Sequence, residues 1–316
     1  MNTEIKNRYD FVYLFDVKDG NPNGDPDQAN LPRADAENQQ GLVTDVCIKR
    51  KVRNYIQTKY EDDKSAKYGI FIRQRSIDEQ YPFLNKEIEN AGDALQDKKK
   101  TLLEQYFDIR AFGAVLSTGK ESIAATEDGD EGEKEKGKGK TKGKKTKGAG
   151  TVRGPVQLTF GRSIDPIYQA EHSITRCVIT DEKKYDELKE KMEFPSTFGR
   201  KSTVPYGLYR MHGFISAVDA KKTGFSEADL ELLWESLLNA FENDRAAARG
   251  EMRPRKLVVF KHSSHLGNAR SGELFDLVKV ESSKDAQKPA RSFTDYMLTI
   301  PKQSDMPQGV EVQVKL

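Results

Sequence analysis

The sequence predicts an α+β protein built around a β-sheet. Stretches rich in β-branched and aromatic residues, namely residues 10–17, 206–215 and 257–260, are typical of buried strands. Helical patterns over residues 44–60 and 226–249 lie between them. Because strands and helices interleave without a regular βα repeat, we expect a sheet domain with insertions.

The first half of the chain predicts one strand followed by two helices. Residues 10–17 are followed by turn formers over residues 19–27, so the strand ends in a polar loop. The pattern over residues 44–60 predicts a helix with four side chains on one apolar face: Ile48, Val52, Tyr55 and Ile56. A second helical stretch covers residues 85–112 and ends at Gly113.

The second half predicts a helix among several strands. Ser226 to Asp229 form a capping box. The helix that they open has a core face of Leu230, Leu233, Trp234, Leu237 and Phe241. We expect it to end with Arg245 and Arg249 before Gly250, because cations and a glycine suit a helix carboxyl end. Strands are expected at residues 156–160, 174–179, 206–215, 257–260, 293–300 and 310–316.

A low-complexity segment separates the two halves. Sequence complexity falls between residues 121 and 150, where an acidic run gives way to Gly–Lys alternation over residues 137–148. Without apolar side chains this segment cannot offset its own ordering entropy, so we expect a solvated surface loop. Its lysines could contact RNA phosphates, but we expect them to be simply solvated, because runs of like charge are usually disordered loops or tails.

Composition limits the class of protein but does not itself indicate a nucleic-acid binder. The 52 basic and 50 acidic side chains give a net charge of +2, so any surface for a polyanion must come from local clustering. No apolar run is long enough to span a bilayer and the amino terminus shows no signal segment, so we expect a cytoplasmic protein with no membrane partner. Cys47 and Cys177 are expected to be buried free thiols.

Two basic clusters are candidates for phosphate contacts. Lys49, Arg50, Lys51 and Arg53 stand at the start of the helix over residues 44–60, and Arg33 precedes it in the loop. A clustered basic face supplies cations for RNA binding that is independent of sequence, although an ordinary solvated helix face has the same pattern. The second cluster flanks the stretch between two expected strands and comprises His172, Arg176, Arg200 and Lys201. Phe194 and Phe198 lie in that stretch and could stack on bases or pack in a core.

The loop over residues 19–30 partly matches a calcium loop. Acidic, amide and glycine residues occupy positions 1, 3, 5, 6, 7 and 9, but the twelfth position, which should be a bidentate Glu, is Asn30. A strand precedes the loop and two prolines interrupt it, so we expect turns and no metal. His262 and His265 are spaced as in some zinc sites, but no cysteine or acidic pair stands nearby to complete four ligands.

A series of motifs resembles the backbone subunit of type I-C CRISPR Cascade complexes, a branch of the RAMP superfamily. The motifs occur in order along nearly the whole chain: Asp19 to Asp27, Leu31 to Arg33, Gly41 to Val46, Asp108 to Gly113, Val152 to Gln157, Glu171 to Arg176 and Val204 to Arg210. The Gly–Lys tract near residues 132–150 departs from that family.

The resemblance implies a fold and a set of partners. The fold would be one domain over residues 1–316, with a modified RRM-like (ferredoxin-like) palm and finger and thumb insertions at about residues 19–40, 121–150 and 181–203. Several copies would stack head to tail along one CRISPR RNA (crRNA), which would read target DNA by base pairing. The other partners would be the large, small and crRNA-processing Cascade subunits.

The resemblance also bears on the site. It favours RNA contact for the two basic clusters and a thumb wedge formed by Phe198, and it implies no catalytic residue, metal or cofactor. The alternative is a metal-dependent endoribonuclease, because relatives of this superfamily in type III complexes cut RNA with a loop aspartate. Asp25, Asp27 or Asp35 would play that part here, unless these side chains shape turns and pair with arginines such as Arg33.

Overall fold

The computed structural model describes residues 3–62, 67–116, 150–176, 181–190, 197–282 and 288–316. The chain divides into two compact units. The sheet unit comprises residues 7–55, 158–215 and 232–316, and the helical unit comprises residues 1–6, 56–157 and 216–231. Three of the boundaries between them fall within α1 (Asp45–Lys59), β7 (Val156–Leu158) and α7 (Glu227–Leu238), and the other two follow Lys6 and Ile215. The single domain predicted over residues 1–316 stays a prediction.

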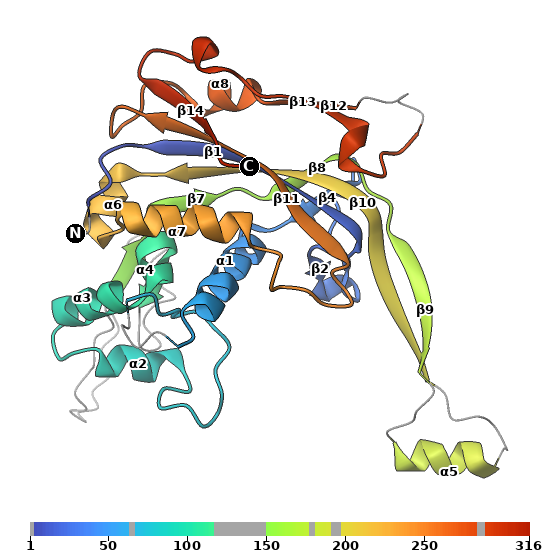
Figure 1. Ribbon diagram of the computed structural model, residues 1–316. Helices are drawn as coiled ribbons and strands as arrows, with labels where there is room; N and C mark the ends of the chain where they lie inside the picture. The colour runs from blue at the N-terminus through green and yellow to red at the C-terminus, as the bar shows by residue number, and fades with distance from the viewer. Residues whose placement is uncertain (1–2, 63–66, 117–149, 177–180, 191–196, 283–287) are drawn as a thin grey trace, which may run out of the picture. The chain divides into compact units, whose positions relative to one another are not determined.

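A mixed α/β fold with a central antiparallel sheet forms the sheet unit (Figure 1). The strands follow the order β14–β11–β1–β10–β8–β4 and each neighbouring pair in this path is antiparallel. Their bounds are β1 (Tyr9–Gly20), β4 (Gln40–Val43), β8 (Gly161–Pro166), β10 (Thr197–Ile215), β11 (Glu251–His262) and β14 (Val310–Val314). The α+β class expected from the sequence is therefore confirmed.

The central strand β1 is buried on both faces. Its residues from Tyr9 to Val17 are all buried, including the two carboxylates Asp10 and Asp16, so the strand does not alternate between buried and exposed positions. On one face Phe11 packs edge-on against Trp234 of α7, with ring centroids 5.1 Å apart. On the other face Val12 and Leu14 pack with residues of α8 (Ser271–Asp276). A ligand therefore cannot lie on the β1 surface, and binding groups must be sought at strand ends and loops.

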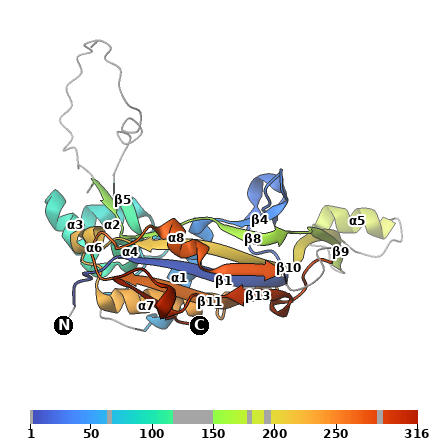
Figure 2. The same cartoon turned by 90° about the horizontal axis from the view of Figure 1, so that it is seen from above.

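A two-stranded arm extends from the sheet. β9 (Ala170–Arg176) pairs with residues 197–203 of β10, so one strand of 19 residues belongs to both the arm and the central sheet. Figure 2 shows α5 (Glu182–Glu190) at the far end of this ribbon. Cys177 and part of the predicted insertion over residues 181–203 lie outside the described residues.

The last part of the chain covers the second face of the sheet. It contains α8, the hairpin of β12 (Lys279–Ser282) and β13 (Tyr296–Thr299), and the short 3₁₀ helices η2 (Phe293–Asp295) and η3 (Gln303–Asp305). The strand expected over residues 293–300 thus begins with a 3₁₀ turn.

His262 is fully buried. Its Nε2 lies 3.0 Å from Asp10 Oδ2, and its Nδ1 accepts a hydrogen bond from the Asn268 N–H. This imidazole is therefore part of the core, and both of its ring nitrogens are engaged by protein groups.

The helical unit holds α2 (Leu84–Asn90), α3 (Leu95–Gln105), α4 (Phe107–Phe112), α6 (Ala217–Thr223) and the pair β5 (Gly113–Leu116) and β6 (Gly150–Arg153). The single helix expected over residues 85–112 is wrong. It breaks at Gly92, which has φ +155°, and at Tyr106, which is extended. The second break is stabilised by tertiary hydrogen bonds, because Gly69 pairs with the backbone on either side of Tyr106.

The expected helix over residues 226–249 is too long. The capping box is confirmed, since Ser226 and Asp229 exchange hydrogen bonds, but α7 ends at Leu238. Residues 239–250 form a loop instead, and Asp244 in that loop pairs with Arg249 at 3.1 Å. Arg249 therefore interacts with a side chain of the loop rather than with a helix dipole.

The short loop elements complete the description. The insertion expected at residues 19–40 contains β2 (Gly24–Asp25), η1 (Pro26–Gln28) and β3 (Leu31–Pro32). The Gly–Lys segment up to residue 149 lies outside the described residues. Among the helices that the structure describes, none is both long enough and apolar enough to cross a bilayer.

One histidine in the sheet should make stability depend on pH. Burial and the neighbouring Arg210 guanidinium lower the pKa of His212 from 6.5 to about 4. The folded state therefore holds a neutral ring, whose Nε2 accepts a hydrogen bond from Arg210 Nε at 2.9 Å. Since the unfolded chain binds the proton more readily, we expect the free energy of unfolding to fall as the pH falls from 6.5 towards 4.

The measurement is urea unfolding of wild type and of His212→Gln across that pH range. The variant should lose most of this pH dependence. His265→Gln, which replaces an exposed histidine, should keep the wild-type profile. A wild-type profile that His212→Gln leaves unchanged would show that other groups carry it.

Candidate nucleic-acid interface

The Asp/Asn/Gly loop after β1 folds into a fixed turn. The N–H of Asn21 donates to the carbonyl of Ala248 at 2.7 Å, and its side-chain amide donates to the carbonyl of Asn30 at 2.7 Å. Ala29 and Asn30 take left-handed backbone conformations that close the turn. Gly20 is required before it, because a Cβ there would lie 2.0 Å from the carbonyl oxygen of Arg249. The loop is thus held to the segment after α7.

Two neighbouring hollows lie around this turn, and we call them the loop hollows. They share Asn21, Asn30 and Ala248 in their linings. The first has a volume of about 270 Å³ and is also lined by three cations: Arg50, Lys51 and Arg249. The second, of about 230 Å³, is also lined by Glu171, Arg200, Lys201 and Ser202. Basic residues from α1 and from the arm, some 150 positions apart in sequence, therefore surround one loop.

Two arginines in these linings are placed for contact with an anion. Arg50 and Arg200 are both exposed. Within the described part of the chain, neither side chain makes a hydrogen bond or an ion pair. A guanidinium that is not engaged by a carboxylate can offer its N–H groups to a phosphate. We therefore regard these two as the strongest candidates for phosphate contacts.

The sequence places Lys51 in a clustered basic helix face, but the structure buries its side chain. Its side chain is 4% exposed and forms an ion pair with Asp244. Its amine also lies 5.5 Å from the centre of the Phe241 ring. Because Asp244 stands 193 residues further along the chain, the sequence pattern around Lys51 could not reveal this pairing. We expect Lys51 to hold the loop after α7 in place.

The other cations of the first cluster lie outside the linings of the loop hollows. Lys49 Nζ lies 3.0 Å from Asp45 Oδ2, one helical turn earlier. Arg53 is half-buried and interacts with another group of the protein. Arg33 lies 3.4 Å from Asp25 and is half-buried. Their predicted RNA contacts stay predictions.

The second cluster follows the arm. His172 is exposed, with Nε2 3.0 Å from the Thr203 hydroxyl, and its backbone pairs with Lys201. The backbone of Arg176 pairs with Thr197, and Phe198 pairs with Thr175. The side chains of Arg176 and Phe198, and the whole of Phe194, lie outside what the structure describes. The thumb wedge therefore stays a prediction.

The loop carboxylates interact with arginines and backbone. Asp25 accepts a hydrogen bond from the Asp27 N–H and pairs with Arg33. Asp35 lies 2.9 Å from Arg162, and this bond, with a second from the Glu37 N–H, holds the pKa of Asp35 below its ordinary value. Among the described residues, no three His, Cys, Asp or Glu side chains converge as ligands for a metal ion. These contacts agree with the turn-shaping role weighed for Asp25 and Asp35.

Sequence reasoning missed part of the lining. Glu171 and Ser202 gave no separate signal, because only the pairing of β9 with β10 brings them beside the loop. Arg249 was assigned to a helix end.

Cys47, predicted to be a buried free thiol, is free and half-buried beside the first hollow, and burial raises its thiol pKa. Chemically, the loop hollows combine exposed guanidinium groups with amide side chains, which suits binding of a polyanion.

The fold and the loop hollows define a mixed α/β protein with a candidate surface for a polyanion. Residues 7–301 match the family model described as CRISPR-associated protein Cas7. Because this match spans most of the chain, the protein belongs to the Cas7 family.

The individual relatives share only a minority of their residues with this chain. The chain is 25% identical to the CRISPR-associated protein Cas7 of Haloferax volcanii over 307 residues, covering 93% of this chain and 81% of that protein. Two solved structures, titled "CRISPR RNA-guided surveillance complex" and "CRISPR RNA-guided surveillance complex, pre-nicking", give TM-scores of 0.41 and 0.44. Both chains are 12% identical to this one over 80% of its length, and the matches cover 68% and 75% of those chains.

Proposed function

We propose that this protein is the crRNA-binding backbone subunit of a type I-C Cascade complex. Several copies stack head to tail along the spacer of one guide RNA and present it for pairing with target DNA. The other Cascade subunits, large, small and crRNA-processing, complete the assembly in the cytoplasm. The protein holds RNA and is not an enzyme. Membership of the Cas7 family supports this proposal.

The observation that carries the proposal is the meeting of distant cations around one fixed loop. Arg50 comes from α1 and Arg200 from the arm, yet both line the loop hollows. A guide holder must bind many different spacers, so its contacts must go to the phosphate backbone, which is common to all of them. Exposed arginines held around a fixed turn meet that requirement, whereas a set of base-reading side chains would not.

The connectivity of the sheet unit supports an RRM-like palm. Taken in chain order, β1, α1, β8, β10, α7 and β11 form a βαββαβ series whose strands lie in the order β11–β1–β10–β8. The arm of β9 and β10 is placed as the thumb, with Phe198 as its wedge. Because both faces of β1 are covered, we place the RNA across the loop hollows and not across the sheet.

The test is to express the chain with a cognate CRISPR array and the other Cascade genes, purify it and sequence the RNA that accompanies it. We expect spacer-length guide RNA in a large complex. The chain purified without the other subunits is then incubated with labelled RNA and Mg²⁺ or Mn²⁺, and a holder leaves the RNA intact. Shortened RNA would instead support the endoribonuclease alternative at Asp25, Asp27 or Asp35, and a monomer without RNA would overturn the proposal.

A further inference from the structure

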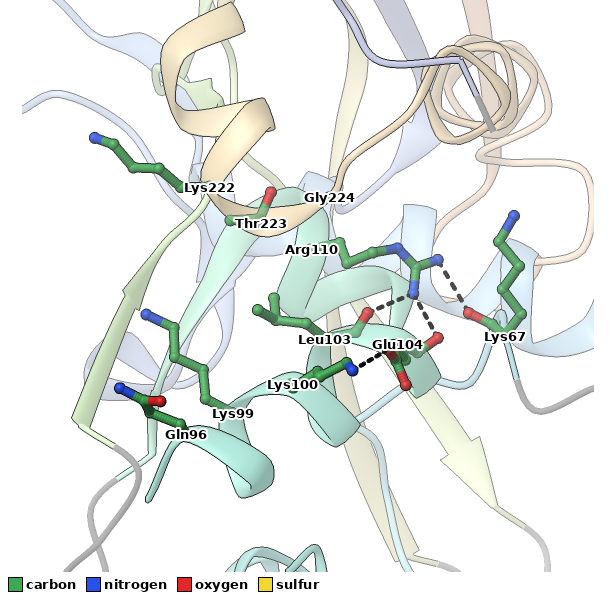
Figure 3. A pocket seen from close by; sticks show the side chains of 10 residues that line it. All are labelled: Lys67, Gln96, Lys99, Lys100, Leu103, Glu104, Arg110, Lys222, Thr223 and Gly224. Atoms are coloured by element: carbon green, nitrogen blue, oxygen red, sulfur yellow. Dashed lines mark hydrogen bonds and ion pairs between the residues drawn. The ribbon is translucent and has the colours of Figure 1, made fainter. Parts of the chain in front are cut away.

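A separate hollow of about 650 Å³ lies within the helical unit (Figure 3). α3 and the end of α6 line it, together with Arg110 of α4 and Lys67 of the segment before α2. Its volume is in the range that holds small organic ligands in proteins. None of its lining residues belongs to the loop hollows, so the function proposed above leaves it unused.

The wall of this hollow is preformed. Arg110 is 4% exposed, and its guanidinium donates to the carbonyls of Leu103, Glu104 and Lys67 at 2.8, 3.1 and 3.0 Å. It also donates to Asp229 Oδ1 at 2.9 Å. One buried side chain therefore fixes the carboxyl end of α3 to the segment before α2. A fixed wall lowers the ordering cost that a ligand would otherwise meet.

Cations dominate the lining. Four lysines and Arg110 face one acidic side chain, Glu104. Asp229 balances Arg110, and Lys222 lies 3.0 Å from Asp219, but the cations still outnumber the acids. Figure 3 shows Lys99 of α3 and Lys222 of α6 extending their amines on the same side of the hollow. Two amines from different helices can thus reach one anionic group.

The rest of the lining limits the chemistry of the ligand. Leu103, Thr223 and the methylene stems of the lysines give the hollow apolar surface. A small inorganic anion would leave that surface in contact with water. A wholly apolar ligand would remove water from the amines without replacing their hydrogen bonds. The two requirements are met together by a ligand with a flat ring at one end and several negative charges at the other.

We propose that this hollow is a binding site for a free nucleoside phosphate. The ring lies against Leu103, and the phosphates lie between the amines of Lys99 and Lys222. This site is independent of the guide-binding surface. RNA recovery in the complex therefore neither supports nor opposes it.

The test is calorimetric titration of the purified full-length chain with ADP, adenosine, inorganic phosphate and a single-stranded oligonucleotide. We expect ADP to bind. Adenosine and phosphate should each bind at least about tenfold more weakly than ADP, because each satisfies only half of the site. Lys99→Ala/Lys222→Ala should weaken ADP binding by about tenfold or more, since it removes both amines.

Lys86→Ala/Lys279→Ala is the matched control. It removes two exposed lysines that do not line the hollow and should bind ADP as wild type does. Circular dichroism of both variants checks that they fold. No heat of ADP binding up to about 1 mM, equal losses in the two variants, or displacement of bound ADP by the oligonucleotide would each overturn the proposal.

Discussion

Arg50→Ala/Arg200→Ala should weaken guide RNA binding by about 10–100-fold near physiological salt, because each guanidinium contributes a charge-assisted contact. Both side chains are exposed and line the loop hollows from different elements. The logarithm of affinity against the logarithm of salt concentration should become flatter by about 1 to 2 units, as fewer counterions are released. Filter binding of labelled spacer RNA at several salt concentrations measures both quantities.

Arg270→Ala/Arg291→Ala is the control for this experiment. It removes the same charge from two exposed arginines outside the loop hollows. Wild-type affinity and salt slope are expected for it. If the two double variants lose affinity equally, the effect comes from net charge and the loop hollows are not the RNA surface.

Asp229→Ala should lower the free energy of unfolding by about 3–5 kcal/mol, the largest stability effect we expect from a single substitution. Asp229 is completely buried and accepts hydrogen bonds from Arg110 Nη2 at 2.9 Å and from the Ser226 N–H and hydroxyl at 2.9 and 2.8 Å. Its removal leaves the Arg110 guanidinium buried without a counter-charge and also removes the carboxylate half of the capping box at the amino terminus of α7. Urea unfolding followed by circular dichroism measures the loss.

Glu242→Ala provides the comparison on the surface. Glu242 pairs with Arg245, and both side chains are more than half exposed, so its loss should change stability by about 0–1 kcal/mol. A similarly small loss for Asp229→Ala would mean that water enters beside Arg110 and that the pair is not a buried one.

The fold could be predicted where local pattern and tertiary packing agree. Residues 10–17 are apolar except for Asp10 and Asp16 because β1 is covered on both faces, so the pattern predicted the strand. The helix over residues 85–112 could not be divided from its sequence, because Tyr106 is extended to meet Gly69 in another part of the chain. Such long-range hydrogen bonds leave no periodic signal.

The candidate site was predictable to a similar extent. The clustering of basic residues at the start of α1 predicted a phosphate-binding surface there, and Arg50 of that cluster does line a loop hollow. The same clustering could not separate it from Lys51, whose partner Asp244 lies 193 residues away. Arg200 was expected only because its segment flanks two strands, and the register of β9 on β10 is what brings Glu171 and Ser202 beside it.

The double coverage of β1 has a consequence for how this chain can change in length. Successive residues of a strand point to opposite faces, so deleting one residue within Tyr9–Val17 would exchange the side chains packed on α7 with those packed on α8. Neither set fits the other's cavity, and we expect β1 to tolerate no insertion or deletion. The arm has exposed residues along β9, so two-residue changes there preserve the faces of β10. Differences in length among natural variants should therefore accumulate in the arm.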